Sequence, residues 1–200
     1  MTKLQTSNIF LDSTPISFNE LFGNDHPVEV EIGCGKGKFL LQRAEVSPEI
    51  NFIGVDWARK WLGVGELKGK KSNLPNLLFF REHALEWISR LPENSISVFH
   101  IYFPDPWPKR RHHRRRLISE AFLILLHTKL RSDGCIEIAT DDRNYDQHIQ
   151  RVIHSQAEKW NLREGRERLA YPMFKTHYEI KYEAEGRLLH YRELEKALEV

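Results

Sequence analysis

The chain contains little cysteine and no long apolar run. Its only two cysteines, Cys34 and Cys135, lie far apart and form no Cys-x-x-Cys or Cys/His pattern. This usage indicates reduced thiols in a cytoplasmic protein, with no disulfide framework and no metal centre. No apolar stretch reaches the roughly 18 residues that a membrane span needs. The first five residues also lack the apolar core of a signal peptide. We therefore expect a soluble, cytoplasmic protein that does not bind a membrane.

Internal repeats, low-complexity segments and Gly-, Ser- or Pro-rich linkers are also missing. With 200 residues, 40% of them hydrophobic, the expectation is a single domain with one sizeable core. Within it we distinguish a short N-terminal segment at 1–27, a core at 28–160 and a C-terminal part at 161–200.

Short β-rich runs alternate with helical patterns along the core. Strands are predicted at 28–32, 51–55, 77–80, 96–103 and 135–139, and helices at 37–46, 58–71, 84–91, 117–130 and 142–157. After Trp160 the pattern is less regular, with a loop predicted at 165–173, a helix at 176–185 and a strand at 187–192. The alternation predicts an α/β fold with a parallel sheet covered on both faces. The strand at 96–103 is apolar on both alternating sets, which is typical of a central strand.

Positive charge is concentrated in one short segment after the fourth strand. Six of the eight residues from Lys109 to Arg116 are lysine or arginine, and the other two are histidine. The net charge of the whole chain is only +2, so the rest carries about −4. A solvated basic turn is the ordinary explanation of such a run. Its concentration instead favours a local site for a polyanion.

A rigid turn precedes these cations. Pro104, Pro106 and Pro108 fix φ around Asp105 and Trp107, so a carboxylate and a large aromatic ring are held at the end of a strand. A carboxylate would weaken a purely electrostatic phosphate clamp. Its presence indicates that the site handles something besides phosphate, and this combination favours nucleic acid as the partner.

A glycine-rich turn, Glu31-Ile32-Gly33-Cys34-Gly35-Lys36-Gly37, leads from the first strand into the first helix of the core. A P-loop is excluded because Phe39 follows Lys38 where a serine or threonine is needed. A dinucleotide fingerprint needs G-x-G-x-x-G, and Glu31 would repel a pyrophosphate. The same carboxylate is favourable beside a cationic ligand, so S-adenosylmethionine (SAM) fits better.

Asp56 closes the second strand of the same βαβ unit. A carboxylate there can accept hydrogen bonds from both ribose hydroxyls of an adenosine. Alone, it could equally be a helix N-cap. The two motifs together make a nucleoside ligand the better interpretation.

Four motifs in order carry a family resemblance: Glu31-x-Gly33-x-Gly35-x-Gly37, Pro104-Asp105-Pro106-Trp107-Pro108-Lys109, Thr140-Asp141-Asp142 and Thr176-x-Tyr178-Glu179. The chain resembles the bacterial-type tRNA (guanine-N7)-methyltransferases from about Val28 to Arg192. The resemblance implies a Rossmann-like SAM-dependent methyltransferase with a mostly parallel seven-stranded sheet, a cofactor-binding core and a substrate-binding C-terminal part. It also implies methyl transfer to N7 of the variable-loop guanine at position 46 of tRNA, by a monomer or homodimer without an accessory subunit.

Site residues follow from the resemblance by position. SAM is expected at Glu31, Gly33, Gly35, Gly37, Asp56, His83, Ala84 and Asp105, and Asp105 is the expected catalytic residue. The RNA substrate is expected at Lys109, Asp141, Thr176, His177, Tyr178 and Glu179, with phosphate contacts from Arg110, Arg111, Arg114, Arg115 and Arg116. Asp141 and Asp142 could instead cap the next helix, Tyr178 could belong to the core, and Trp107 could stack or only wedge the turn. His83 stands where relatives usually have an acidic residue.

The chemistry limits the role of Asp105. Guanine N7 has a free lone pair, so it can attack a methyl group without losing a proton. We therefore expect Asp105 to orient the guanine through its N–H edge, or to stabilise the positive charge that moves to the purine, and not to act as a base.

Two rival functions remain open. One is a non-catalytic RNA-binding protein on a methyltransferase scaffold, which SAM binding would test. The other is a SAM-dependent enzyme for a non-RNA substrate, which would leave the run from Lys109 to Arg116 without a role.

Overall fold

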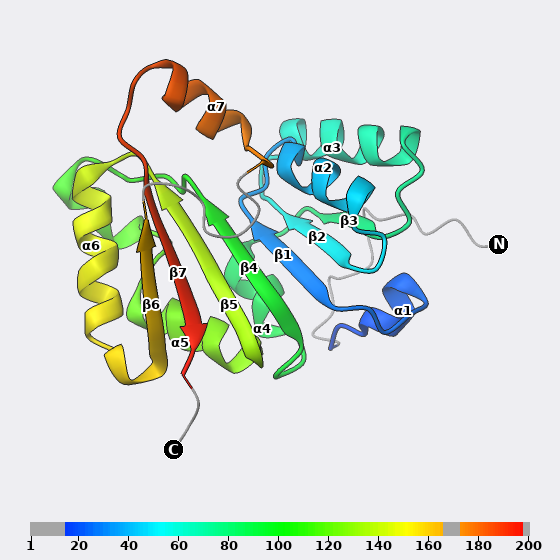
Figure 1. The fold of residues 1–200 in the computed structure, drawn as a ribbon, viewed down its shortest axis with the longest axis horizontal. Helices are drawn as coiled ribbons and strands as arrows, with labels where there is room; N and C mark the ends of the chain where they lie inside the picture. Colours follow the sequence, from blue (N-terminus) through cyan, green and yellow to red (C-terminus); the bar gives the residue numbers. More distant parts are fainter. Residues whose placement is uncertain (1–14, 166–172, 198–200) are drawn as a thin grey trace.

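A computed structural model describes residues 15–165 and 173–197, and Figure 1 shows one sheet with helices on both faces. The strands are β1 (Val28–Ile32), β2 (Asn51–Val55), β3 (Leu77–Phe80), β4 (Ile96–Tyr102), β5 (Leu130–Thr140), β6 (Trp160–Gly165) and β7 (His190–Lys196). Their order is β3-β2-β1-β4-β5-β7-β6. The first five pair in parallel, whereas β7 runs antiparallel to both of its neighbours. The expected mostly parallel seven-stranded sheet is confirmed, with β4 at its centre.

The helices divide between the two faces. They are α1 (Phe18–Phe22), α2 (Lys38–Val46), α3 (Arg59–Lys71), α4 (Ala84–Ser89), α5 (Glu120–Lys129), α6 (Arg143–His154) and α7 (His177–Ala184), with 3-10 helices η1 (Arg110–Arg115) and η2 (Ala157–Lys159). One apolar cluster joins the sheet to α4, α5 and α6, and a second joins its other face to α2, α3 and α7. Within the described ranges, no helix is both long and apolar to the extent that crossing a membrane requires.

Most element boundaries agree with the pattern of the sequence. The first three strands have the predicted bounds, and β4 ends one residue early because Phe103 turns to φ 52°. The helix predicted at 117–130 starts at Glu120 because the Ser119 side chain accepts the N–H of Phe122 and caps it. That helix ends at Lys129, so β5 begins five residues before its predicted start.

The C-terminal prediction needs correction. The strand expected at 187–192 lies at His190–Lys196, and β6 was not predicted. β6 is a polar edge strand with only one buried residue, Trp160, so its sequence carries no clear alternation. The helix expected at 176–185 is confirmed as α7. Of the loop expected at 165–173, residues 166–172 lie outside the described part of the chain, and Gly165 belongs to β6.

A charged cluster is buried between the sheet and α2. Alternation along the strands sends Glu29 of β1, His100 of β4 and Glu137 of β5 to this face, and all three side chains are at most 4% exposed. His100 Nε2 lies 3.0 Å from Glu29 Oε2, and its Nδ1 lies 3.0 Å from Glu137 Oε2. Arg43 of α2 donates to Glu29 over 2.9 Å, and the Tyr102 hydroxyl donates to Glu137. The cluster therefore ties α2 to the three central strands.

The two carboxylates keep the His100 ring protonated. Burial alone lowers the pKa of His100, but the hydrogen bonds with Glu137 and Glu29 outweigh burial and raise that pKa to about 9. The apolar expectation for both faces of this strand is thus wrong at His100, where a cation lies in the core. Stability from this cation is present below its ordinary pKa near 6.5 and is lost as pH rises towards 9.

We predict that the free energy of unfolding falls by about 2 kcal/mol between pH 6.5 and 8.5 because unfolded His100 releases its proton in this range. Denaturant titrations at a series of pH values measure this dependence. The control is the double variant His100→Gln/Glu137→Gln, which removes the imidazole and its main partner together. An equal slope in the double variant would show that His100 is not the titrating group.

Candidate functional site

The expected site residues follow the carboxyl ends of β1 to β5. Because these strands are parallel, their carboxyl ends meet at one edge of the sheet, towards which β4 and β5 point and over which α7 lies (Figure 1). The loops at this edge contain the glycine-rich turn, Asp56, His83, Asp105 and Asp141, in that order along the chain. The fold thus brings all four sequence motifs to one edge.

The glycine-rich turn has the backbone that its sequence predicts. Gly33, Gly35 and Gly37 have φ of 79°, 54° and 63°, a region that other residues rarely adopt. A β-carbon placed on Gly33 or Gly35 would meet no atom within 4 Å, so open space borders the backbone there. Helix α2 starts after this turn without a side-chain cap. A ligand can therefore approach the backbone closely.

Two carboxylates flank the turn. Asp56 Oδ2 accepts the N–H of Gly35 over 2.8 Å and Oδ1 accepts the N–H of Ala58 over 2.7 Å, so Asp56 fixes the turn to the start of α3. Burial, Glu31 and Asp56, in that order, raise the pKa of the Cys34 thiol well above its ordinary value. The negative charges of Glu31 and Asp56 are thus both felt at Cys34, in the middle of the turn.

This arrangement fits SAM. Open backbone at two glycines leaves room for the ligand, and carboxylates suit its ammonium and ribose hydroxyl groups. Each oxygen of Asp56 keeps a second lone pair beside the backbone N–H that it accepts. Glu31 is 4% exposed at the end of β1. His83 is the N-cap residue of α4, caps it with no side-chain hydrogen bond and is exposed, and Ala84 is the first residue of the helix.

The ring of Phe79, on β3, packs against the glycine-rich turn. A β-carbon on Gly37 would lie 2.5 Å from the Phe79 ring, one on Gly54 2.7 Å, and one on Gly65 3.0 Å. Three glycines therefore leave the space that this ring fills, and α3 approaches the turn closely.

The turn around Asp105 is strained as well as proline-rich. Phe103 and Trp107 have φ of 52° and 47°, which costs energy in residues with bulky side chains. Asp105 is exposed, and its Oδ1 accepts the N–H of Trp107 over 3.2 Å. The Trp107 ring packs edge-on against the His112 ring. The guanidinium carbon of Arg115 lies over the Trp107 ring, 5.0 Å from the ring centroid. Trp107 thus fills the space between the turn and η1.

Arg116 lies below this turn and not on the surface. Its side chain donates to the Pro106 carbonyl over 2.9 Å and to Asn144 Oδ1 over 2.7 Å, and its guanidinium lies over the Tyr145 ring. Arg116 is only 6% exposed, and burial lowers its pKa. It therefore fixes the turn to α6, a position that differs from the expected surface contact. The other basic residues of the segment are exposed, namely Lys109, Arg110, Arg111, Arg114 and Arg115.

The expected substrate segment at 176–179 begins α7 with a capping box. Thr176 Oγ1 accepts the N–H of Glu179, and Glu179 accepts the N–H of Thr176 and the hydroxyl of Tyr191. Both side chains are buried and hold the segment in place. His177 and Tyr178 are exposed, so Tyr178 does not belong to the core. Their side chains face solvent.

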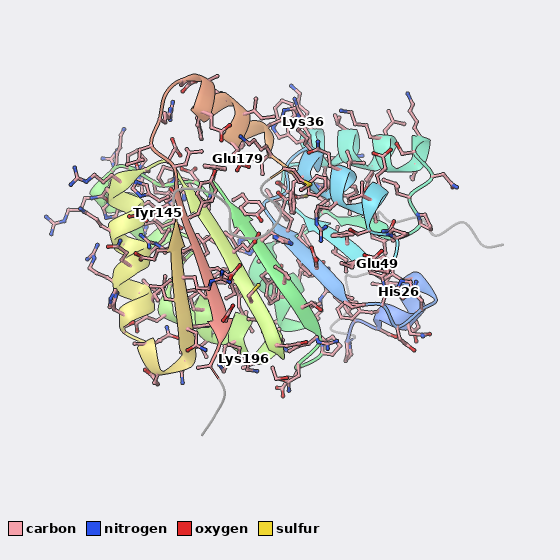
Figure 2. The ribbon with its side chains drawn as sticks, viewed as in Figure 1. His26, Lys36, Glu49, Tyr145, Glu179 and Lys196 are labelled. Carbon is pink, nitrogen blue, oxygen red and sulfur yellow. The ribbon has the colours of Figure 1, made fainter. Side chains whose placement is uncertain are left out.

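Contacts of α7 and of the loop after it hold this helix over the sheet edge. Asp141 forms an ion pair with Arg187 over 2.5 Å, and the Tyr182 ring packs against Phe103. Asp142, and not Asp141, caps α6 through the N–H of Tyr145. Burial, then Lys38, Lys36 and Lys68, lower the pKa of His177, so α7 begins beside the glycine-rich turn. Figure 2 shows Lys36 and Glu179 at this edge.

Sequence reasoning missed the residues that support the site from other elements. Asn144 and Tyr145 of α6 hold Arg116, Arg187 holds Asp141, and Tyr191 of β7 holds Glu179. Each contact joins residues that are far apart along the chain, so no local spacing indicates it.

We predict that Gly54→Ala lowers the free energy of unfolding by about 1–3 kcal/mol because its methyl group would lie 2.7 Å from Phe79 and 2.8 Å from Cys34 Sγ. Thermal and denaturant unfolding measure the loss, and calorimetry with SAM shows weaker binding. The matched control is Gly63→Ala on α3, where an added methyl group meets nothing within 4 Å. Equal stability of the two variants would rule out the steric role of Phe79.

Comparison with known proteins agrees with this geometry. A family model described as "Putative methyltransferase" matches residues 25–191. A tRNA (guanine-N(7)-)-methyltransferase of Psychromonas ingrahamii is 37% identical over 165 residues, which are 82% of this chain and 68% of that relative. One from Idiomarina loihiensis is 33% identical over 184 residues, which are 90% of this chain and 75% of that relative.

Solved structures confirm the Rossmann-like methyltransferase fold. An antibiotic-related methyltransferase superposes with a TM-score of 0.63 at 17% identity, covering 94% of this chain and 96% of that structure. At that identity the likeness shows the fold alone. Both curated relatives are more than 30% identical to this chain over more than two thirds of their own length. The chain therefore belongs to the family of tRNA (guanine-N(7)-)-methyltransferases.

Proposed function

We propose that this protein transfers a methyl group from SAM to N7 of the guanine at position 46 in the variable loop of tRNA. The observation that carries the proposal is the position of the Asp105 turn. It shares one edge of the sheet with the glycine-rich turn, and exposed cations follow it directly. Relatives named tRNA (guanine-N(7)-)-methyltransferase support the substrate and the atom.

The cofactor side of the site belongs to the turns after β1 and β2. When bound, SAM supplies an electrophilic methyl group on a positively charged sulfur. Glu31 and Asp56 place negative charge where a cationic ligand is stabilised, and the backbone of Gly33 and Gly35 allows close approach. Asp56 already holds two backbone N–H groups, so it presents its remaining lone pairs in a fixed direction.

The guanine side of the site belongs to Asp105. N7 carries a free lone pair, so no residue needs to remove a proton. An exposed carboxylate can accept hydrogen bonds from the N–H edge of guanine, and the strained turn limits the positions that this carboxylate reaches. Charge that develops on the purine is stabilised by the same group. Asp105 thus positions the base and does not act as a general base.

The RNA is held on both sides of Asp105. Lys109, Arg110, Arg111, Arg114 and Arg115 contact phosphates, which positions the RNA without reading its sequence. Selection of guanine falls to Asp105, to Asp141 and to α7, where exposed His177 and Tyr178 reach the RNA while Thr176 and Glu179 hold the helix start. We further propose that the protein acts in the cytoplasm as a monomer or homodimer, without an accessory subunit.

Methyl transfer from labelled SAM to tRNA transcripts tests the proposal. We expect transfer to a transcript with guanine at position 46, none with adenine there, and strand cleavage specific for N7-methylguanine at that position alone. Transfer to the adenine transcript at an equal rate would contradict the assigned position. Binding of SAM and tRNA without transfer would contradict the catalytic function.

We predict that Arg114→Ala and Arg115→Ala each weaken binding to all tRNAs by a similar factor and reduce the slope of log affinity against log salt by about one. The reason is that each arginine neutralises a phosphate but contacts no base. Filter binding at several salt concentrations measures both quantities. The control is Arg131→Ala, since Arg131 is paired with Asp133 at the start of β5. A change in which nucleotide is methylated would contradict this division of roles.

A further inference from the structure

Two tryptophans are exposed beside the glycine-rich turn. Trp57 is 67% exposed and Trp61 is 42% exposed, although large aromatic side chains are usually mostly buried. Trp57 directly follows Asp56 and therefore lies close to the cofactor site. Trp61 lies on the first turn of α3, and none of the four sequence motifs includes it.

Cations lie over the ring of Trp61. Lys36 Nζ is 4.6 Å from the ring centroid and Lys60 Nζ is 5.0 Å from it. Lys68 follows Trp61 by seven residues, so both project from the same face of α3. In residues 15–165 and 173–197, no carboxylate forms an ion pair with Lys36, Lys38, Lys60 or Lys68. Their charge is therefore open to an external anion.

The packing of α3 fixes this arrangement. A β-carbon on Gly65 would lie 3.1 Å from the Lys36 carbonyl oxygen, so the helix contacts the turn directly at this glycine. Trp61 precedes Gly65 by one helical turn and is thereby held next to Lys36. We call Lys36, Lys60, Trp61 and Lys68 the Trp61 surface.

The Trp61 surface lies across the sheet edge from the basic segment. Arg116 fixes that segment to α6, whereas the Trp61 surface belongs to α3 and the turn before α2. α6 and α3 lie at opposite ends of the sheet in Figure 1, with α7 between them. The site between them is thus bordered by cations on both sides.

We propose that the Trp61 surface is a second contact surface for tRNA, on which an unpaired base stacks against Trp61 while the lysines contact the neighbouring phosphates. The proposal rests on the proposed function, since it assumes that tRNA is the substrate. An aromatic ring beside lysines that pair with no carboxylate of the described residues suits single-stranded nucleic acid, because every base has a face that can stack. The two side chains that lie over the ring are lysines, which favours an anionic partner over an apolar protein surface.

The test measures the affinity of the full chain for tRNA with Trp61→Ala and Trp61→Phe. Trp61→Ala should weaken binding about tenfold, Trp61→Phe should retain most of the affinity, and the salt dependence should stay unchanged in both. Lys60→Ala should weaken binding and also reduce the salt slope by about one. The matched control is Ile124→Ala, because Ile124 is 45% exposed on α5, which covers the opposite face of the sheet from α3.

Other readouts separate the alternatives. SAM affinity, measured by calorimetry, should be the same in Trp61→Ala and in the unsubstituted protein, and a matching loss would place Trp61 in the cofactor site and overturn the proposal. A change of oligomeric state in sedimentation would make the surface an interface between copies and also overturn it. Unchanged tRNA affinity in Trp61→Ala, with normal methylation by the unsubstituted protein, would refute this surface alone. Absence of any tRNA methylation would refute the proposed function itself.

Discussion

The contact of Phe79 with three glycines is the constraint on which the cofactor side of the molecule depends. The ring occupies the space that side chains on Gly37, Gly54 and Gly65 would need. Its position lets α3 contact the glycine-rich turn, which Asp56 then holds through the N–H of Gly35. Phe79, by packing, and Asp56, by a hydrogen bond, therefore both stabilise the left-handed backbone of the turn. A preorganised turn does not have to be ordered when a ligand binds.

Different contacts hold the Asp105 turn, which is the proposed guanine side of the site. Prolines and two non-glycine residues with positive φ hold the Asp105 turn in one shape, and the buried Arg116 fixes that turn to α6. Burial, and after it the carboxylate of Asp105, raise the pKa of Tyr145 to about 12. Asp105 therefore lies close enough to α6 to act on it electrostatically. Both sides of the site are thus rigid, while the charges that would contact phosphates remain exposed. Rigid positioning of two reactants can supply several kcal/mol of rate enhancement.

The sequence predicts much of this arrangement but not its supports. Alternation of strands and helices locates β1 to β3 correctly, because these β-rich runs are short and have clear ends: Gly33 follows β1, Asp56 follows β2 and Arg81 follows β3. β6 was not predicted because it is a polar edge strand, and the charged face of β4 was not predicted because His100 lies between Phe99 and Ile101 in a mostly apolar run. The motifs indicated residues that the fold brings to one edge of the sheet. Arg116 resembled its exposed neighbours, and only the tertiary contact with Asn144 distinguishes it.

The central claim is that Asp105 holds the N–H edge of guanine while N7 attacks. The most direct test compares single-turnover methyl transfer to tRNA carrying guanosine or inosine at position 46, in the unsubstituted protein and in Asp105→Ala. Inosine keeps N7 but lacks the exocyclic amine. We predict that inosine slows the unsubstituted protein by about tenfold or more, as expected for a lost hydrogen bond to a charged group, and that Asp105→Ala does not distinguish the two bases. An equal penalty for inosine in both proteins would contradict the account.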